Sequence, residues 1–149
     1  MTSLTERLEE VERQEVIDDT AKLIDDEVAR KSGISGMAIK TGYKVVKRLK
    51  PNMIEEAIDS LLDEFSQALD PLYQQFLADD ETETFEAYLA DHDDQAADDL
   101  LGITDARAEN AENRVLKKTY KKLRGQAKKH VQEALPGVGR LIDEHAPKE

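Results

Sequence analysis

The sequence predicts an all-α protein, a compact bundle of six to eight helices with no sheet, and three observations support this. Apolar residues recur at spacings of three and four, as they do along one face of a helix. No strand-like alternation of β-branched residues continues for more than a few positions. Proline occurs only at positions 51, 71, 136 and 147. Because 149 residues suit one domain, we expect residues 1–149 to form a single helical domain.

The first two helices are marked by their end signals. Ser3 and Glu6 have the spacing of a capping box, which predicts the start of a helix at the N-terminus. A second apolar pattern runs from Arg13 to about Lys31, where basic residues favour the last turn of a helix. Gly33 is expected to stop this helix.

A third helix is expected over residues 36–50. Its predicted apolar face consists of Ala38, Gly42, Val45 and Leu49, with Ile39 and Val46 beside them. A glycine in mid-helix costs about 1 kcal/mol relative to alanine, so we expect Gly42 to let another helix approach closely. Replacement of Gly42 by Leu is then expected to overpack that contact and destabilise the fold.

Four further helices and one long one complete the prediction. The four are expected at residues 51–69, 71–77, 85–89 and 97–108. The long helix runs from Arg114 to Leu135, and Pro136 with Gly137 is expected to interrupt it before a short terminal helix. We expect the helices 36–50 and 114–135 to be central and partly buried. Because the chain has three Phe, four Tyr and no Trp, an aliphatic core is expected.

Charge is strongly segregated along this acidic chain, whose formal net charge is -12. Between Lys40 and Lys50 there are five cations and no acid, and between Arg114 and Lys129 there are eight cations, again without an acid. On helices, these cations fall on one side and the apolar residues on the other. The candidates for binding an anion are Lys40, Lys44, Lys47, Arg48, Lys117, Lys118, Lys121, Lys122, Arg124 and Lys128.

The stretch GISGMAIKTG, residues 33–42, superficially resembles a phosphate-binding loop, because it has three glycines and a Lys-Thr pair. In such a loop a glycine precedes the lysine and a strand precedes the loop. Here Ile39 precedes the lysine and a helix precedes the stretch, so we reject a nucleotide-binding loop.

Catalytic and metal-binding patterns are also missing from the sequence. His92, His130 and His145 fall in no zinc-binding spacing, and His130 is expected to be a satisfied or partly buried side chain rather than a ligand. A calcium loop starting at Asp91 would need a glycine where Ala96 stands. The chain has no Cys and no serine in a glycine-flanked turn. We therefore predict no metal, no cofactor and no enzymatic activity.

The expected location is the cytoplasm. Absence of cysteine is compatible with a reducing compartment. The N-terminal stretch is charged within six residues and offers neither the apolar run of a signal peptide nor a transmembrane segment.

Three stretches carry a family resemblance: KSGISG at 31–36, ITDARA at 103–108 and KLRGQAKKHVQEALPGVGRLID at 122–143. With these, the chain resembles a family of short bacterial all-helical proteins of unknown function. The resemblance covers nearly the whole chain. It implies an all-helical single domain and supplies no catalytic residue.

Two hypotheses for the function remain, and the partner is unknown in both. The leading one is a non-enzymatic interaction protein with segregated acidic and basic surfaces, which binds protein or a second copy of itself. Its basic faces would then neutralise acidic neighbours, each pair contributing little. The alternative is a binding module for an anionic partner, namely nucleic acid, a phosphorylated ligand or membrane headgroups, with Tyr43 and Tyr120 as stacking groups beside the cations.

Overall fold

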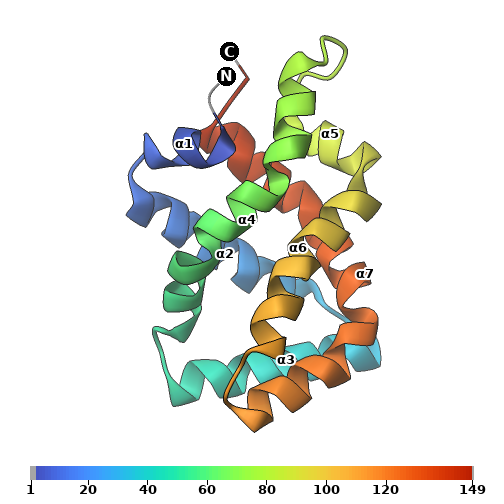
Figure 1. Ribbon diagram of the computed structural model, residues 1–149. Coiled ribbons are helices and arrows are strands. Elements are labelled where there is room, and N and C mark those ends of the chain that lie inside the picture. Colours follow the sequence, from blue (N-terminus) through green and yellow to red (C-terminus); the bar gives the residue numbers. More distant parts are fainter. Residues whose placement is uncertain (1–2, 149) are drawn as a thin grey trace.

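The computed structural model describes residues 3–148, without the side chains of Ser35 and Leu49. Over this range the chain forms seven α-helices and no strand, which confirms the predicted all-α bundle (Figure 1). The helices are α1 (Leu4–Glu9), α2 (Arg13–Arg30), α3 (Gly33–Leu49), α4 (Met53–Ala78), α5 (Phe85–Asp91), α6 (Asp93–Glu109) and α7 (Arg114–His145).

Most predicted helix ends are confirmed. Ser3 caps α1 by accepting a hydrogen bond from the backbone N–H of Glu6 at 3.1 Å. α2 ends at Arg30, as expected. Gly33 does not stop α2 but is the first residue of α3, with a φ of 76° that favours glycine. α3 therefore begins one turn earlier than predicted.

The breaks predicted at Pro71 and Pro136 are wrong, because α4 and α7 each run through their proline. Proline inside a helix removes one backbone donor and leaves the carbonyl four residues earlier without it. Both prolines lie at exposed positions, where water can replace the missing donor. The chain therefore has two long helices where four were expected.

The core lies at one end of the molecule, where α1, α5 and the second halves of α4 and α7 meet. Its members, buried in one cluster, are Leu4, Leu8, Leu69, Leu72, Tyr73, Phe76, Phe85, Tyr88, Leu89, Ala96, Leu135, Ile142 and Ala146. Four aromatic rings pack at its centre, with neighbouring centroids 5.4–6.4 Å apart. The core is therefore not purely aliphatic as expected, since four of the seven aromatic residues of the chain lie in it beside nine aliphatic residues.

Two buried glycines bring α7 against its neighbours. A Cβ atom at Gly139 would lie 2.4 Å from the Cα of Glu86 in α5, and one at Gly137 would lie 2.3 Å from a methyl carbon of Leu23 in α2. This close approach lets Asp143 of α7 accept hydrogen bonds from the backbone of Phe85 at 2.7 Å and of Glu86 at 3.2 Å. The close packing that sequence reasoning assigned to Gly42 occurs here instead.

The two basic helices are peripheral, which contradicts the expectation that they are central. Among its described side chains and glycines, α3 buries only Gly36, and the first buried residue of α7 is Leu135. In Figure 1, α3 and the start of α7 lie along the lower end of the molecule, opposite the N-terminus and the C-terminus. The basic end of the molecule is thus separate from its core.

Candidate anion-binding surface

α3 turns the apolar face predicted for packing toward solvent. Ala38, Gly42 and Val45 are exposed, as is Ile34 one turn earlier, with 93% of its surface accessible. We call these four residues the α3 stripe. The side chain of Leu49, the remaining member of the predicted face, lies outside the described part of the chain. A Cβ atom at Gly42 would meet nothing within 4 Å, so the predicted close approach at Gly42 is wrong.

The opposite side of α3 makes the packing contacts. Gly36 is buried there, and Ile39, Tyr43 and Val46 are half-buried. These residues are 3 or 4 apart, so they form a second apolar face on the same helix. Sequence reasoning chose the wrong one of two apolar faces, because periodicity alone does not say which face meets the protein.

The first half of α7 presents cations to solvent. Its half-buried side includes Tyr120, Leu123 and Ala127, as the sequence predicted, whereas the residues expected on the same side one turn earlier are exposed, namely Val115, Leu116 and Thr119. The cations on the exposed side form what we call the α7 row: Arg114, Lys118, Lys121, Lys122 and Lys129. Val115 adjoins the row and is 73% exposed. The outer face of this half-helix is therefore cationic along its length.

α3 is anchored to α2 by one carboxylate. The hydroxyl of Tyr43 donates a hydrogen bond to Asp25, and the Nζ atom of Lys47 lies 3.1 Å from Asp25 Oδ1. The hydrogen bonds from Tyr43 and Lys47 hold the pKa of Asp25 below its ordinary value. Burial and the hydrogen bond to Asp25 raise the pKa of Tyr43, so its hydroxyl stays protonated as a donor.

α7 is anchored to α6 in the same way. The hydroxyl of Tyr120 donates to Asp105 Oδ1 at 2.5 Å, and Arg124 donates to both oxygens of Asp105 at 2.7 and 3.1 Å. Arg124, followed by Tyr120, lowers the pKa of Asp105. In both basic helices a tyrosine and the cation four residues later thus bind one aspartate on the preceding helix. The two tyrosines are held inward and half-buried, so they are not placed to stack on a ligand.

The ten predicted site residues therefore divide into two groups. Four have partners within the chain: Lys47 binds Asp25, Arg124 binds Asp105, Lys128 binds Asp94 at 2.7 Å, and Lys117 donates to the carbonyl of Glu109 at 3.0 Å. The other six form no ion pair with any residue that the structure describes, and they are Lys40, Lys44, Arg48, Lys118, Lys121 and Lys122.

Sequence reasoning missed two kinds of residue at this surface. Arg114 and Lys129 were left out of the candidates, although they lie in the same acid-free segment as the other cations. The second kind is the exposed apolar group, whose large members are Ile34, Met37, Val45, Val115 and Leu116. All five lie on α3 or in the first turn of α7. No signal in the sequence marks them, because their periodicity also suits a buried face.

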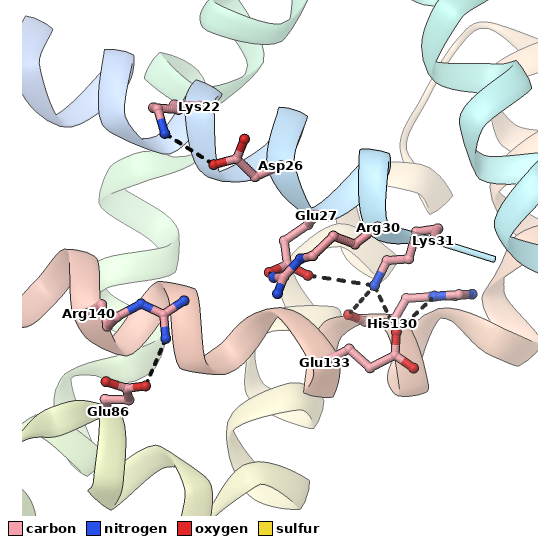
Figure 2. Close-up of polar contacts among 9 residues, drawn as sticks. All are labelled: Lys22, Asp26, Glu27, Arg30, Lys31, Glu86, His130, Glu133 and Arg140. Carbon is pink, nitrogen blue, oxygen red and sulfur yellow. Dashed lines mark hydrogen bonds and ion pairs between the residues drawn. The ribbon is translucent and has the colours of Figure 1, made fainter.

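A buried charge cluster joins α2 and the start of α3 to α7 (Figure 2). Lys31 is 7% exposed, and its Nζ atom lies 2.9 Å from Glu133 Oε2 and 3.9 Å from Glu27 Oε2. The hydrogen bond from Lys31 lowers the pKa of Glu133. A buried ion that loses its partner strongly destabilises the fold. The ion pair with Glu133 therefore keeps Lys31, and with it the short connection from α2 to α3, against α7.

Two histidines lie near carboxylates. His130 is half-buried, as expected, but neither ring nitrogen has a hydrogen-bond partner among the described residues, and Nδ1 is 3.7 Å from Glu133 Oε2. His145 Nε2 lies 2.8 Å from Asp19 Oδ2, and a carboxylate oxygen of Glu144 is within 4.8 Å of both. Since the hydrogen bond between His145 and Asp19 explains this closeness, the group is no evidence for a metal.

The surface grooves of the molecule are open. One of about 380 Å³ lies between α4, α6 and α7 and is lined mainly by apolar side chains, among them Leu61 and Leu123. Arg107 at its edge is held by Glu64 at 3.1 Å. The groove offers no convergent set of free polar groups to a reacting molecule.

Comparison with known proteins assigns the chain by family only. The model of a family described as "Family of unknown function (DUF6918)" matches residues 4–146. No curated protein and no solved structure matches the chain. Among the helices that the structure describes, none combines the length and apolar character needed to cross a membrane.

Proposed function

Because the chain belongs to the family of unknown function DUF6918, which assigns no activity, we propose its function from the geometry of its surface. It is a non-enzymatic interaction protein that binds an anionic partner through α3 and the first half of α7. The observation that carries this proposal is the outward position of cations that form no ion pair with a described residue, namely Lys44 and Arg48 of α3 and the α7 row.

The cations of this surface form two groups with different roles. One group binds aspartates of neighbouring helices and holds the basic helices in place: Lys47, Arg124 and Lys128. The outer cations form no ion pair with a described residue and repel one another, although Glu133, one turn after Lys129, offsets part of this repulsion at the end of the α7 row. A bound anion would relieve that repulsion, and its attraction would weaken as salt screens the charges.

Self-association, which the leading hypothesis from the sequence includes, fits this surface less well. Two copies related by a twofold axis would pack the same face together. On α3 that face carries Lys44 and Arg48 and no acid, so the pairing would bring like charges together.

A cytoplasmic location is part of the proposal. The chain has no cysteine, which is compatible with a reducing compartment. The cytoplasm also contains both nucleic acid and anionic lipid, so an anionic partner of either class is within reach there.

The test compares two double variants of equal net charge. Lys118→Gln with Lys122→Gln removes two cations of the α7 row. Lys22→Gln with Arg140→Gln removes two exposed cations elsewhere, each from a surface ion pair shown in Figure 2. A cation near an anionic surface contributes about 1 kcal/mol, so the first variant should bind roughly 30-fold more weakly and the second almost normally.

The probes are a duplex oligonucleotide, a single-stranded RNA and vesicles of phosphatidylcholine with phosphatidylglycerol, each at low salt. We expect binding to at least one probe, with affinity that falls steeply as salt rises. Absence of binding to all three at low salt would contradict the proposal. Equal loss of affinity in both variants would also contradict it, because net charge rather than this surface would then decide binding.

A further inference from the structure

The α3 stripe consists of exposed apolar residues, and cations adjoin it on one side. This combination favours one class of anionic partner over the others. We propose that the anionic partner is a lipid bilayer, and that α3 lies flat in the interface with its stripe inserted among the lipids. This inference rests on the proposed function and adds to it the partner and the inserted residues.

α3 exposes three large apolar side chains that do not pack against the rest of the protein. Ile34 is 93% exposed and Met37 67%, and Val45 is 48% exposed further along the helix. A monomeric protein tolerates single exposed apolar residues without consequence. Here, however, every large hydrophobic residue found strongly exposed in the described part of the chain lies on α3 or in the first turn of α7.

Cations adjoin the α3 stripe, as they do on helices that lie in a membrane interface. At about 100° per residue, Lys44 and Arg48 lie on either side of Met37, adjoining the stripe. Long basic side chains can keep their charge at the headgroups while their stems lie beside inserted apolar groups. No acid occurs between residues 28 and 54, so nothing on α3 itself repels an anionic headgroup. Such a basic amphipathic helix binds in the plane of the interface.

The attachment of α3 to the protein supports this orientation. Its packing side is fixed by Tyr43 and Lys47 on Asp25, so the stripe faces away from α2. The helix has 17 residues, which gives a length of about 25 Å at 1.5 Å per residue. A single inserted element binds membranes weakly, and stable attachment takes a second signal such as a basic patch. The α7 row supplies it, since the first half of α7 lies at the same end of the molecule as α3 (Figure 1).

The same observations disfavour nucleic acid as the partner. Binding to phosphates uses cations but has no need of Ile34 and Val45 in solvent. Tyr43 and Tyr120, which could stack on bases, are held inward by Asp25 and Asp105.

The chain contains no tryptophan, so one introduced tryptophan reports insertion directly. We would place it in the stripe by Val45→Trp and, as the matched control, at an exposed position of α5 by Ala90→Trp. On addition of vesicles of phosphatidylcholine with phosphatidylglycerol, the fluorescence of V45W should shift to the blue and that of A90W should not. Vesicles of phosphatidylcholine alone should shift neither.

A second pair of variants separates insertion from charge attraction. Ile34→Ser with Val45→Ser keeps every charge and alters only exposed side chains, so the fold should be retained. Loss of two inserted apolar groups should weaken vesicle binding about tenfold or more and leave any binding to an oligonucleotide unchanged. Ile34→Leu with Val45→Ile keeps the apolar character and should bind vesicles as the original chain does.

The outcomes distinguish this inference from the proposed function. Vesicle binding with a blue shift in V45W and loss in the double serine variant supports both. Salt-sensitive binding to vesicles without a blue shift, or binding to an oligonucleotide alone, overturns the inference and leaves the proposed function standing. Failure to bind any of the probes overturns both.

Discussion

Gly139 and Gly42 have opposite surroundings in this structure. At Gly139 a side chain would collide with the backbone of Glu86, a group that cannot move aside. At Gly42 a side chain would point into open space. Both are helical glycines, and the helix propensity of glycine is the same unfavourable quantity at each. The surroundings therefore decide whether replacement by alanine stabilises or destabilises the fold.

Gly139→Ala and Gly42→Ala should change the free energy of unfolding in opposite directions. The first forces α7 away from α5 and disturbs the hydrogen bonds that Asp143 accepts, and we expect a loss of about 2–3 kcal/mol. The second removes an exposed helical glycine and should gain up to about 1 kcal/mol. Urea unfolding measures both changes. A loss of stability in Gly42→Ala would show that its face is covered.

The cations of the surface could be predicted from the sequence, but their partners could not. Acid-free segments identify Lys44 and Lys118 as cations without local partners. The acids that neutralise Lys47 and Arg124 are 22 and 19 residues away, on other helices. Such pairs depend on which side of each helix meets its neighbour, and the spacing of residues in the sequence does not determine that side.

The two basic helices share one mode of attachment. Residues 40–50 and 118–125 are locally similar in sequence, and in both a tyrosine is followed four residues later by a cation. In α3 both bind Asp25, and in α7 both bind Asp105. Each helix is thus held by a carboxylate whose pKa lies below its ordinary value, so attachment of both depends on pH.

Acid should weaken the attachment of α3. The folded-state pKa of Asp25 is lowered, so its contribution to stability is fully present above the unfolded pKa, about 4, and is lost as the pH falls through the lowered folded-state pKa. Asp25→Asn removes this contribution, which for an exposed carboxylate is about 1 kcal/mol or less. The stability difference between the original chain and D25N should be positive at neutral pH and shrink toward zero in acid. A difference that is constant with pH would contradict this role.

The helices themselves were the most predictable part of the fold. Caps, glycines and apolar spacing place α2, α5, α6 and the start of α7 within a few residues. The errors occur at Pro71 and Pro136, where exposure to water lets a helix continue through a proline. The face of α3 was also wrong, because two apolar faces compete on that helix and only tertiary packing distinguishes them.

Stability is distributed unevenly over the molecule. The aromatic cluster and the second half of α7 lie in the core, whereas α3 and the first half of α7 have few buried side chains. Elements with little buried apolar surface open locally at a lower free energy than the global transition. The sequence did not predict this division, since both halves of α7 have the periodicity of a helix with one apolar face.

Amide hydrogen exchange should divide α7 into two parts. Residues 114–129 and α3 should exchange through local opening, well before the segment from Leu135 to Ile142, which is expected to exchange only when the whole protein unfolds. Mass spectrometry of proteolytic fragments resolves these regions. Equal protection along the whole of α7 would contradict the division and point to an additional covering of the basic end.

The separation of the basic end from the rest of the chain gives the molecule a large permanent electric dipole. α3 and the first half of α7, which carry the cations, lie at one end of the molecule, and the turn after α4, which contains Asp79, Asp80 and Glu81, lies at the opposite end (Figure 1). A body with such a dipole turns in the field of a charged surface before it arrives. Its orientation is then set during the approach, and most encounters begin with the basic end in front even though the molecule as a whole carries a net charge of -12.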